Sequence, residues 1–255
     1  MQNPQANIIT EAQMQVGPYA GQSLSPFKRS AKKLASQTEG SFLISNVRFD
    51  NRWWFMEIDT QNIASYQLLG QTEMGEEQNV HVMLRCQLQT PATLYPMDGV
   101  QSDRAEMQDF ILSVNPHEAN GQTVAGRRDG VHTTAFRVLP TNKLFKALKK
   151  SPTTIVESNE LNLSANQKNR VLDSFLSHSA ERAGTSLFNY TQNNCSTHLW
   201  DSLFDAFEVE SFVSEKHQEQ LKTLAKRGRN SFTIAQEMGI LGKSCMDFRQ
   251  AQATA

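Results

Sequence analysis

The sequence predicts an α+β fold, because strand-like and helix-like patterns occupy different parts of the chain. Short apolar or alternating runs, broken by Asn, Asp, Gly and Pro, fill residues 41–139, whereas apolar residues recur at helical spacing after Pro140. The chain has 255 residues, of which 38% are hydrophobic and 20% charged, so it can bury a sizeable core beneath a polar surface. We therefore expect a sheet from the first half of the chain, packed against helices from the second half.

The chain is predicted to contain one folded domain preceded by an arm. Residues 1–40 are rich in Gln, Ser, Pro and Gly and hold few aromatic residues, so they bury too little apolar surface to offset the cost of ordering the chain. We interpret this segment as a flexible arm that could dock on a protein partner, with residues 30–35 forming a short helix there. The α+β domain is expected over residues 41–250.

The strand-like half places its chemically interesting side chains on definite faces. Six strands are predicted, at 42–49, 53–58, 80–88, 92–95, 110–114 and 131–139. The alternation in 80–88 puts Cys86 on the apolar face and His81 on the opposite, solvated or cleft side. His132 shares the more apolar face of its strand, so it is either a core histidine or a cleft residue. Trp53 and Trp54 must point to opposite faces, one to the core and the other to a cleft or edge.

Five helices are predicted after Pro140. The first begins at Thr141 or Asn142 and ends at Lys150, and the second begins at the capping box of Ser164 and Gln167. The third begins near Cys195 and is amphipathic, and two shorter helices are expected at 214–226 and 232–238.

Charge and hydropathy argue against two classes of partner. The net charge is -1, from 25 basic and 26 acidic residues, so no basic field attracts nucleic acid or anionic lipid. The basic stretches at 28–33, 143–150 and 222–229 are interpreted as solvated helix faces rather than phosphate sites, and 126–130 as a charged hairpin turn rather than an anion site.

Neither a membrane span nor a secretion signal is recognised in the sequence. No window approaches the ~18 to 20 consecutive apolar residues of a spanning helix. Residues 1–16 lack the basic start, apolar run and cleavage site of a signal peptide. Cytoplasmic folding is the default expectation, although a leaderless secretion route leaves no sequence signature.

Of the three cysteines, Cys195 is the best candidate for chemistry. Cys86, Cys195 and Cys245 show no zinc-type spacing, so neither a metal nor a cofactor is expected. Cys195 follows Asn193 and Asn194, either of which can cap the helix, and a helix N-terminus lowers the pKa of a thiol. The alternative is that Cys195 is a small hydrophobic residue in the apolar stripe of its helix.

A nucleophilic thiol needs a nearby base, and two of the six histidines are candidates. These are His81 and His132, both on predicted strands. The others are expected on helix surfaces or in a loop: His117, His178, His198 and His217.

Several short motifs together resemble a known family. The segments 161–167 (LNLSANQ), 188–190 (FNY), 193–197 (NNCST) and 201–203 (DSL) resemble the C-terminal motif region of bacterial permuted papain-like domains, the Lnb N-terminal periplasmic domain group of the NlpC/P60 superfamily. The resemblance covers about residues 155–208. In that group a strand reading His-x-x-Leu-Arg precedes the cysteine, and 81–85 (HVMLR) is similar to it. The resemblance therefore implies that His81 is the first choice of base and His132 the second.

The resemblance also implies a fold and a reaction class. The fold would be permuted papain-like, with an antiparallel sheet packed against helices. The reaction would be cysteine-dependent amide or ester hydrolysis, or acyl transfer, on a peptide, lipid or other acyl substrate. The alternative is a catalytically inactive interaction protein that keeps this fold and docks through its arm and tryptophan region.

Overall fold

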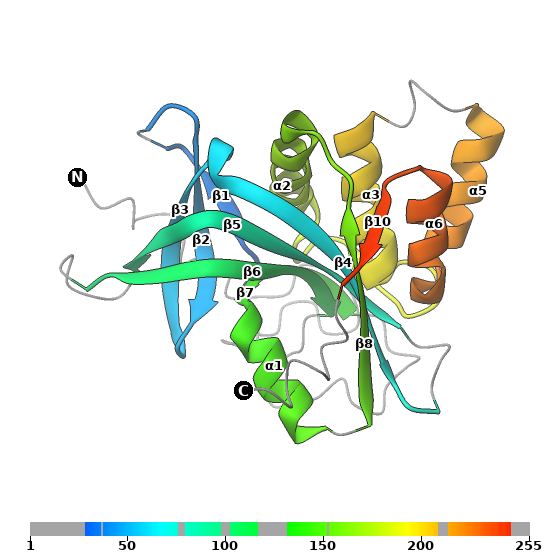
Figure 1. Cartoon of the computed structure of the whole chain (residues 1–255), viewed down its shortest axis with the longest axis horizontal. Helices are drawn as coiled ribbons and strands as arrows, with labels where there is room; N and C mark the ends of the chain where they lie inside the picture. The colour runs from blue at the N-terminus through cyan, green and yellow to red at the C-terminus, as the bar shows by residue number, and fades with distance from the viewer. Residues whose placement is uncertain are drawn as a thin grey trace.

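The computed structural model describes residues 29–36, 38–75, 80–97, 103–116, 132–151, 153–208 and 214–245. Within these ranges, ten strands form an antiparallel sheet and five α-helices pack on it (Figure 1). The α+β prediction is thereby confirmed. The helix-like pattern after Pro140 does form helices, but three further strands lie among them.

The strands are β1 (Lys32–Leu34), β2 (Ser41–Phe49), β3 (Arg52–Asp59), β4 (Ile63–Glu73), β5 (His81–Pro96), β6 (Ala105–Pro116), β7 (His132–Pro140), β8 (Thr154–Leu161), β9 (Leu187–Phe188) and β10 (Leu241–Ser244). The helices are α1 (Thr141–Lys150), α2 (Ala165–Arg182), α3 (Cys195–Phe207), α5 (Glu215–Ala225) and α6 (Ser231–Glu237). Two single turns, η2 (Thr60–Asn62) and η3 (Gly228–Asn230), complete the described elements.

The sheet branches at β5, its longest strand. The strand order is β1-β2-β3-β5-β4-β8-β10, and β6 adds to β5 and continues through β7 to β9. One edge of β5 pairs with β4 along its first half and with β3 at its last residues, and β6 pairs with both halves along the other edge. The predicted strands 80–88 and 92–95 are therefore one continuous strand.

The segment before β1 connects the two arms of this branched sheet. Ala31 N–H donates to the Phe136 carbonyl of β7 (2.7 Å), and the Asn46 amide of β2 donates to the Ser30 carbonyl (2.8 Å). Both Ser30 and Ala31 are fully buried. Residues 32–34 form β1 beside β2, so the short helix considered at 30–35 is wrong. Residues 1–28 and 37 of the expected arm lie outside the described residues.

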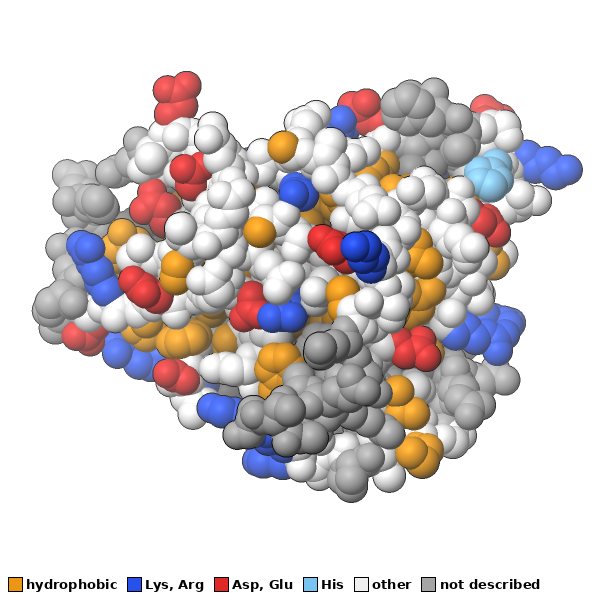
Figure 2. Space-filling model, in the orientation of Figure 1, with side chains coloured by type: hydrophobic (Ala, Val, Ile, Leu, Met, Phe, Trp, Pro, Cys, Tyr) orange, Lys and Arg blue, Asp and Glu red, His pale blue; other side chains and the backbone are white. Residues whose placement is uncertain are grey.

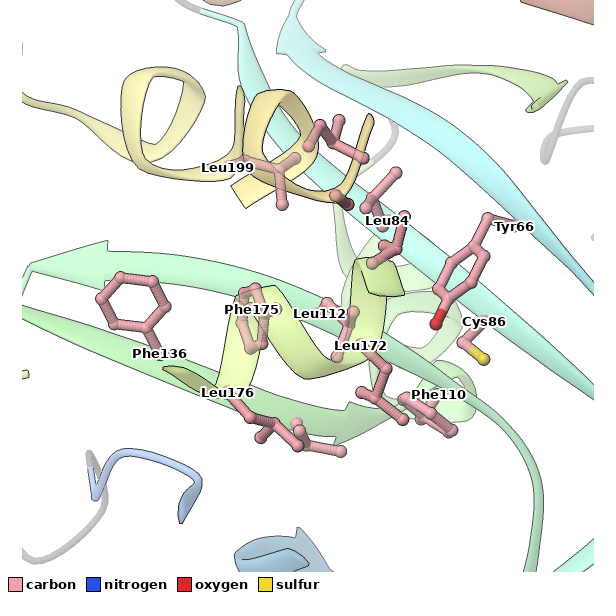
Figure 3. Close-up of a cluster of buried hydrophobic side chains, with 14 of the residues drawn as sticks. Tyr66, Leu84, Cys86, Phe110, Leu112, Phe136, Leu172, Phe175, Leu176 and Leu199 are labelled. Carbon is pink, nitrogen blue, oxygen red and sulfur yellow. The ribbon is translucent and has the colours of Figure 1, made fainter. Parts of the chain in front are cut away.

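Helices cover both faces of the sheet. The main core lies between the sheet and helices α2 and α3, and Figure 3 shows its centre, where Phe175 and Leu199 face Phe136 and Leu112. On the opposite face, Leu148 of α1 packs on a smaller cluster: Leu69, Met83, Ile111 and Val156. Figure 1 shows α1 below the sheet and the other helices above it.

Two strands, β4 and β8, escaped prediction, and for β4 the structure gives a physical reason. In β4, Tyr66 and Leu68 belong to the main core while Leu69 belongs to the cluster under α1. A strand buried on both faces shows no clean alternation, so its period is not readable. The capping box at the start of α2 is confirmed, because the Ser164 hydroxyl accepts from Gln167 N–H and the Gln167 side chain accepts from Ser164 N–H.

The surface and the helix lengths bear on two further expectations. On the face drawn in Figure 2, acidic and basic side chains are interspersed. Among the described helices none is long and apolar enough to cross a membrane. The predicted turn at 126–130 and the loop histidine His117 lie outside the described residues.

Candidate active site

Cys195 is the first residue of α3, as the sequence predicts. Asn194 is the N-cap: its Oδ1 accepts from Ser196 N–H (3.0 Å) and Thr197 N–H (3.2 Å). Its amide group donates to the Lys226 carbonyl (2.8 Å) before η3. The cap therefore fixes the start of α3 against the C-terminal helices. Cys195 is half-buried there, at the border of the main core.

The imidazole of His81 meets the Cys195 sulfur. His81 is the first residue of β5, and its side chain forms a hydrogen bond with the Cys195 side chain. The backbone N–H groups of Val82 and Ser196 also reach the sulfur. Two residues far apart in the sequence, one starting a strand and one starting a helix, are thus brought into contact.

This contact shifts both pKa values in opposite directions. Burial by itself raises the pKa of the Cys195 thiol, but the His81 charge and hydrogen bond and the two backbone N–H groups outweigh it, so this pKa lies below its ordinary value. Burial and the nearby charge of Arg137 lower the pKa of His81. The charge of the Cys195 thiolate and its hydrogen bond raise this pKa by more, so the net shift is upward. These shifts favour a thiolate–imidazolium pair over the neutral pair.

Two polar residues of β6 support the imidazole from its other side. His81 Nε2 lies 3.0 Å from the Ser113 hydroxyl, which leaves the other ring nitrogen, Nδ1, to face the sulfur. Ser113 Oγ in turn accepts a hydrogen bond from the Asn115 amide (2.8 Å). Ser113 is 2% exposed, so this support is shielded from competing water.

Strand register explains why these side chains converge. Met83 of β5 pairs with Ser113 of β6, and no described pair continues this ladder toward His81 and Asn115. Residues two apart in a strand share a face, so His81 and Asn115 lie on the same side of the sheet as Ser113. The ladder ends where Cys195 approaches Val82.

The C-terminal segment presses on the start of β5. A Cβ atom added to Gly228 would lie 2.1 Å from the Val80 carbonyl oxygen, so only glycine permits this approach. Next to it, Ser231 contacts both the Ser196 hydroxyl (3.3 Å) and the Trp200 ring N–H (3.0 Å). The residues beside Cys195 and His81 are thus held by the same short segment.

The other predicted site residues lie elsewhere. His132 is on β7, opposite Phe188 of β9, and is 3% exposed, and it is not among the groups that shift the pKa of Cys195. The structure therefore does not bring His132 into the pair. Cys86 is fully buried beside Tyr66, where burial raises its pKa strongly, and Cys245 follows β10.

Two histidines expected at the surface are buried. His198 is 1% exposed, beside Phe136 and Arg182, and His178 is 4% exposed with its ring bonded to Asp205 (2.5 Å). The surface interpretation of both is wrong, because helices α2 and α3 pack on each other along the polar side as well as the apolar side. Among the described residues, no group of three or more His, Cys, Asp or Glu side chains could hold a metal ion.

Comparisons with protein-family models, with curated proteins and with solved structures give no match for this chain. Sequence reasoning missed Ser113 and Asn115, although both lie in or directly after the predicted strand 110–114. Their spacing of two residues predicts that their side chains share a face of the strand. The sequence does not predict how this strand pairs with the strand of His81.

Proposed function

We propose that this protein is a cysteine-dependent hydrolase or acyltransferase, with Cys195 as nucleophile and His81 as general base and acid. The observation that carries the proposal is the hydrogen-bonded thiol–imidazole pair at the N-terminus of α3. A depressed thiol pKa beside an imidazole is the arrangement that nucleophilic cysteine chemistry requires.

The reaction follows from the two groups. The Cys195 thiolate attacks the acyl carbon of an amide or ester, and the carbonyl oxygen takes up the negative charge. First-turn N–H groups have no partner inside their helix, and in this scheme that of Cys195 receives the oxyanion. The His81 imidazolium then donates its proton to the departing amine or alkoxide, which leaves a thioester. His81 next removes a proton from water or an acceptor alcohol or amine, whose attack releases the acyl group and the thiolate.

Ser113 acts as the positioning residue in this scheme. When His81 carries both protons, its Nε2–H donates to the Ser113 hydroxyl, while Asn115 donates to the same oxygen. This fixes the ring plane with Nδ1 toward the sulfur. A freely rotating imidazole would spend less time in the geometry that transfers the proton.

A permuted papain-like fold is part of the proposal. It is supported by the chain order, with the histidine on a strand before the cysteine helix, and by the polar support on the adjacent strand. The substrate class proposed is an acyl compound. Leu187 (43% exposed) and Tyr190 (41% exposed), close in sequence before Cys195, offer apolar surface for it.

Iodoacetamide alkylation tests the proposal directly. Cys195 should react well below pH 8 and ahead of Cys86 and Cys245, because a thiolate attacks far faster than a thiol. In His81→Ala the low-pH reactivity should disappear, while His132→Ala, the matched control, should keep it. Peptide mapping by mass spectrometry identifies the labelled cysteine.

Two outcomes would contradict the proposal. If Cys195 reacted only after unfolding, the thiol would be structural and the chain would be an interaction protein without catalysis. If His132→Ala removed the low-pH reactivity and His81→Ala did not, the base would be misassigned.

A further inference from the structure

Two of the three large apolar side chains that are exposed among the described residues lie in the loop before Cys195. Leu187 is 43% exposed and Tyr190 is 41% exposed, whereas Phe188 between them is buried. The third, Met74, follows β4. Exposed apolar side chains that are scattered singly are normal in proteins. Two so close together, beside a reactive group, indicate a contact surface.

The loop between β9 and α3 holds these side chains in fixed positions. Asn189 Oδ1 accepts from the backbone N–H groups of residues 191–193, at 2.7 to 3.3 Å, and Asn189 N–H donates to the Asn193 carbonyl (2.8 Å). The Tyr190 ring packs edge-on against the Phe188 ring, with centroids 5.4 Å apart. A surface fixed in this way binds a ligand without the entropic cost of ordering a mobile loop.

The same loop is fixed to the start of α3. Asn194, whose side-chain oxygen caps the helix, donates through its amide group to the Tyr190 carbonyl (3.2 Å). The amide group of Asn193 donates to the Leu187 carbonyl. The backbone of both exposed residues is therefore held beside the helix that Cys195 begins.

Strand register places Leu187 on the same face of the sheet as the His81 imidazole. Leu187 of β9 pairs with Thr133 of β7, and Arg137 of β7 pairs with Ser113 of β6 in a ladder without register shifts. Residues paired across strands share a face, as do residues four apart in one strand. Leu187 is therefore on the Ser113 side of the sheet, where Ser113 contacts the imidazole.

We propose that Leu187 and Tyr190 form a subsite for an apolar amino-acid side chain of a peptide-like substrate, next to the acyl carbon that Cys195 attacks. Two side chains match a group of the size of a leucine side chain rather than a long alkyl chain. Covering them with such a group removes apolar surface from water on both partners, which favours binding. This assignment of substrate class rests on the proposed function.

Two alkylating probes test the subsite on the full chain. N-iodoacetyl-leucine amide and N-iodoacetyl-glycine amide carry the same reactive carbon, so the ratio of their rates at Cys195 measures the contribution of the leucine side chain. The same ratio on the urea-unfolded chain corrects for the intrinsic reactivity of the probes. We expect a corrected ratio of about fivefold in favour of the leucine probe, because the subsite buries part of its side chain.

Substitutions in the loop separate recognition from a structural role. Leu187→Ser and Tyr190→Ser should each lower the corrected ratio toward one, while Tyr190→Leu, which keeps an apolar side chain, should retain it. Met74→Ser removes an exposed apolar side chain elsewhere and is the matched control. The rate with plain iodoacetamide should stay unchanged in all four variants. If that rate fell in parallel with the leucine-probe rate, the role would be structural and the subsite would be overturned.

Chain length and pH distinguish the remaining outcomes. A rate that kept rising from N-hexyl to N-dodecyl iodoacetamide would overturn the assignment to a single side chain. A corrected ratio near one in the wild type would overturn the subsite and leave the reactive pair standing. At about pH 9 an ordinary accessible thiol is ionised, so the ratio measured there does not depend on the pKa of Cys195. If low-pH reactivity is absent but this ratio is high, the hydrolase proposal fails and the subsite stands.

Discussion

Two effects of opposite sign act on the pKa of the Cys195 thiol. Removing a thiolate from water raises the thiol pKa, and a nearby imidazolium with backbone N–H donors lowers it. Each pKa unit corresponds to about 1.4 kcal/mol, so one well-placed charge is enough to decide the outcome. Burial is the largest single contribution, and the His81 ring together with the backbone N–H donors reverses the net direction of the shift.

Replacing Ser113 by alanine should weaken the effect of the His81 ring without removing the pair. Loss of one hydrogen bond, about 1 kcal/mol, lets the imidazole rotate, and we expect the alkylation rate of Cys195 near pH 6 to fall about fivefold. The pH profile should move toward that of His81→Ala. Ser158→Ala, at another buried serine of the sheet, is the control and should leave the profile unchanged. An unchanged profile in Ser113→Ala would show that the ring is held by other contacts.

At the scale of elements, the start of α3 is held from two directions. Asn194 caps the helix through its oxygen and binds the Lys226 carbonyl through its nitrogen, and Gly228 and Ser231 pack beside it. The segment that links helices α5 and α6 therefore determines how α3 meets β5.

Removing the cap should affect stability and reactivity together. Asn194→Ala should lower the free energy of unfolding by about 1 to 2 kcal/mol and also slow alkylation of Cys195, because the helix start is no longer fixed. Ser164→Ala removes the matching cap of α2 and should lower stability by a similar amount in urea unfolding. It should leave the reactivity of Cys195 unchanged. Equal effects of both variants on alkylation would contradict a local role for Asn194.

At the scale of the whole molecule, the interface of α2 and α3 contains a buried histidine that must stay neutral. Burial, Arg182 and His178 lower the pKa of His198 to about 3, against an ordinary value of 6.5. The unfolded chain therefore binds a proton at His198 as pH falls below about 6.5, while the folded chain does not until about pH 3. The contribution of His198 to the free energy of unfolding is therefore fully present above about pH 6.5 and is lost progressively as the pH falls below that value.

His198→Leu tests this pH dependence. Between about pH 7.5 and pH 5.5 the wild-type chain should lose about 1.4 kcal/mol more unfolding free energy than the variant, because only the wild type gains a proton at this site on unfolding. Urea unfolding at the two pH values measures the difference. His217→Leu, a half-exposed histidine of α5, is the matched control. Parallel pH curves for wild type and His198→Leu would mean that the buried ring titrates normally.

Local patterns in the sequence were sufficient to predict several features of this protein. The capped start of α2, the helix beginning at Cys195 and the core position of Cys86 all depend on contacts within a few residues or on a period of two or 3.6. Such patterns are present in the chain before it folds. Strand β4, which contributes side chains to the cores on both faces of the sheet, shows no clean period, and the sequence alone revealed neither β4 nor β8.

The meeting of His81, Ser113 and Cys195 was decided only by the tertiary structure. The strand patterns alone left His81 and His132 as alternative bases, and the family resemblance put His81 first. Register between β5 and β6, and the packing of α3 on the end of that ladder, bring His81 rather than His132 to the Cys195 sulfur. The physical reason is that periodicity sets the face of a side chain, whereas neighbours across strands depend on pairing between distant segments. The approach of Arg29 to the Trp53 ring has the same origin, since the two residues come from separate segments of the chain.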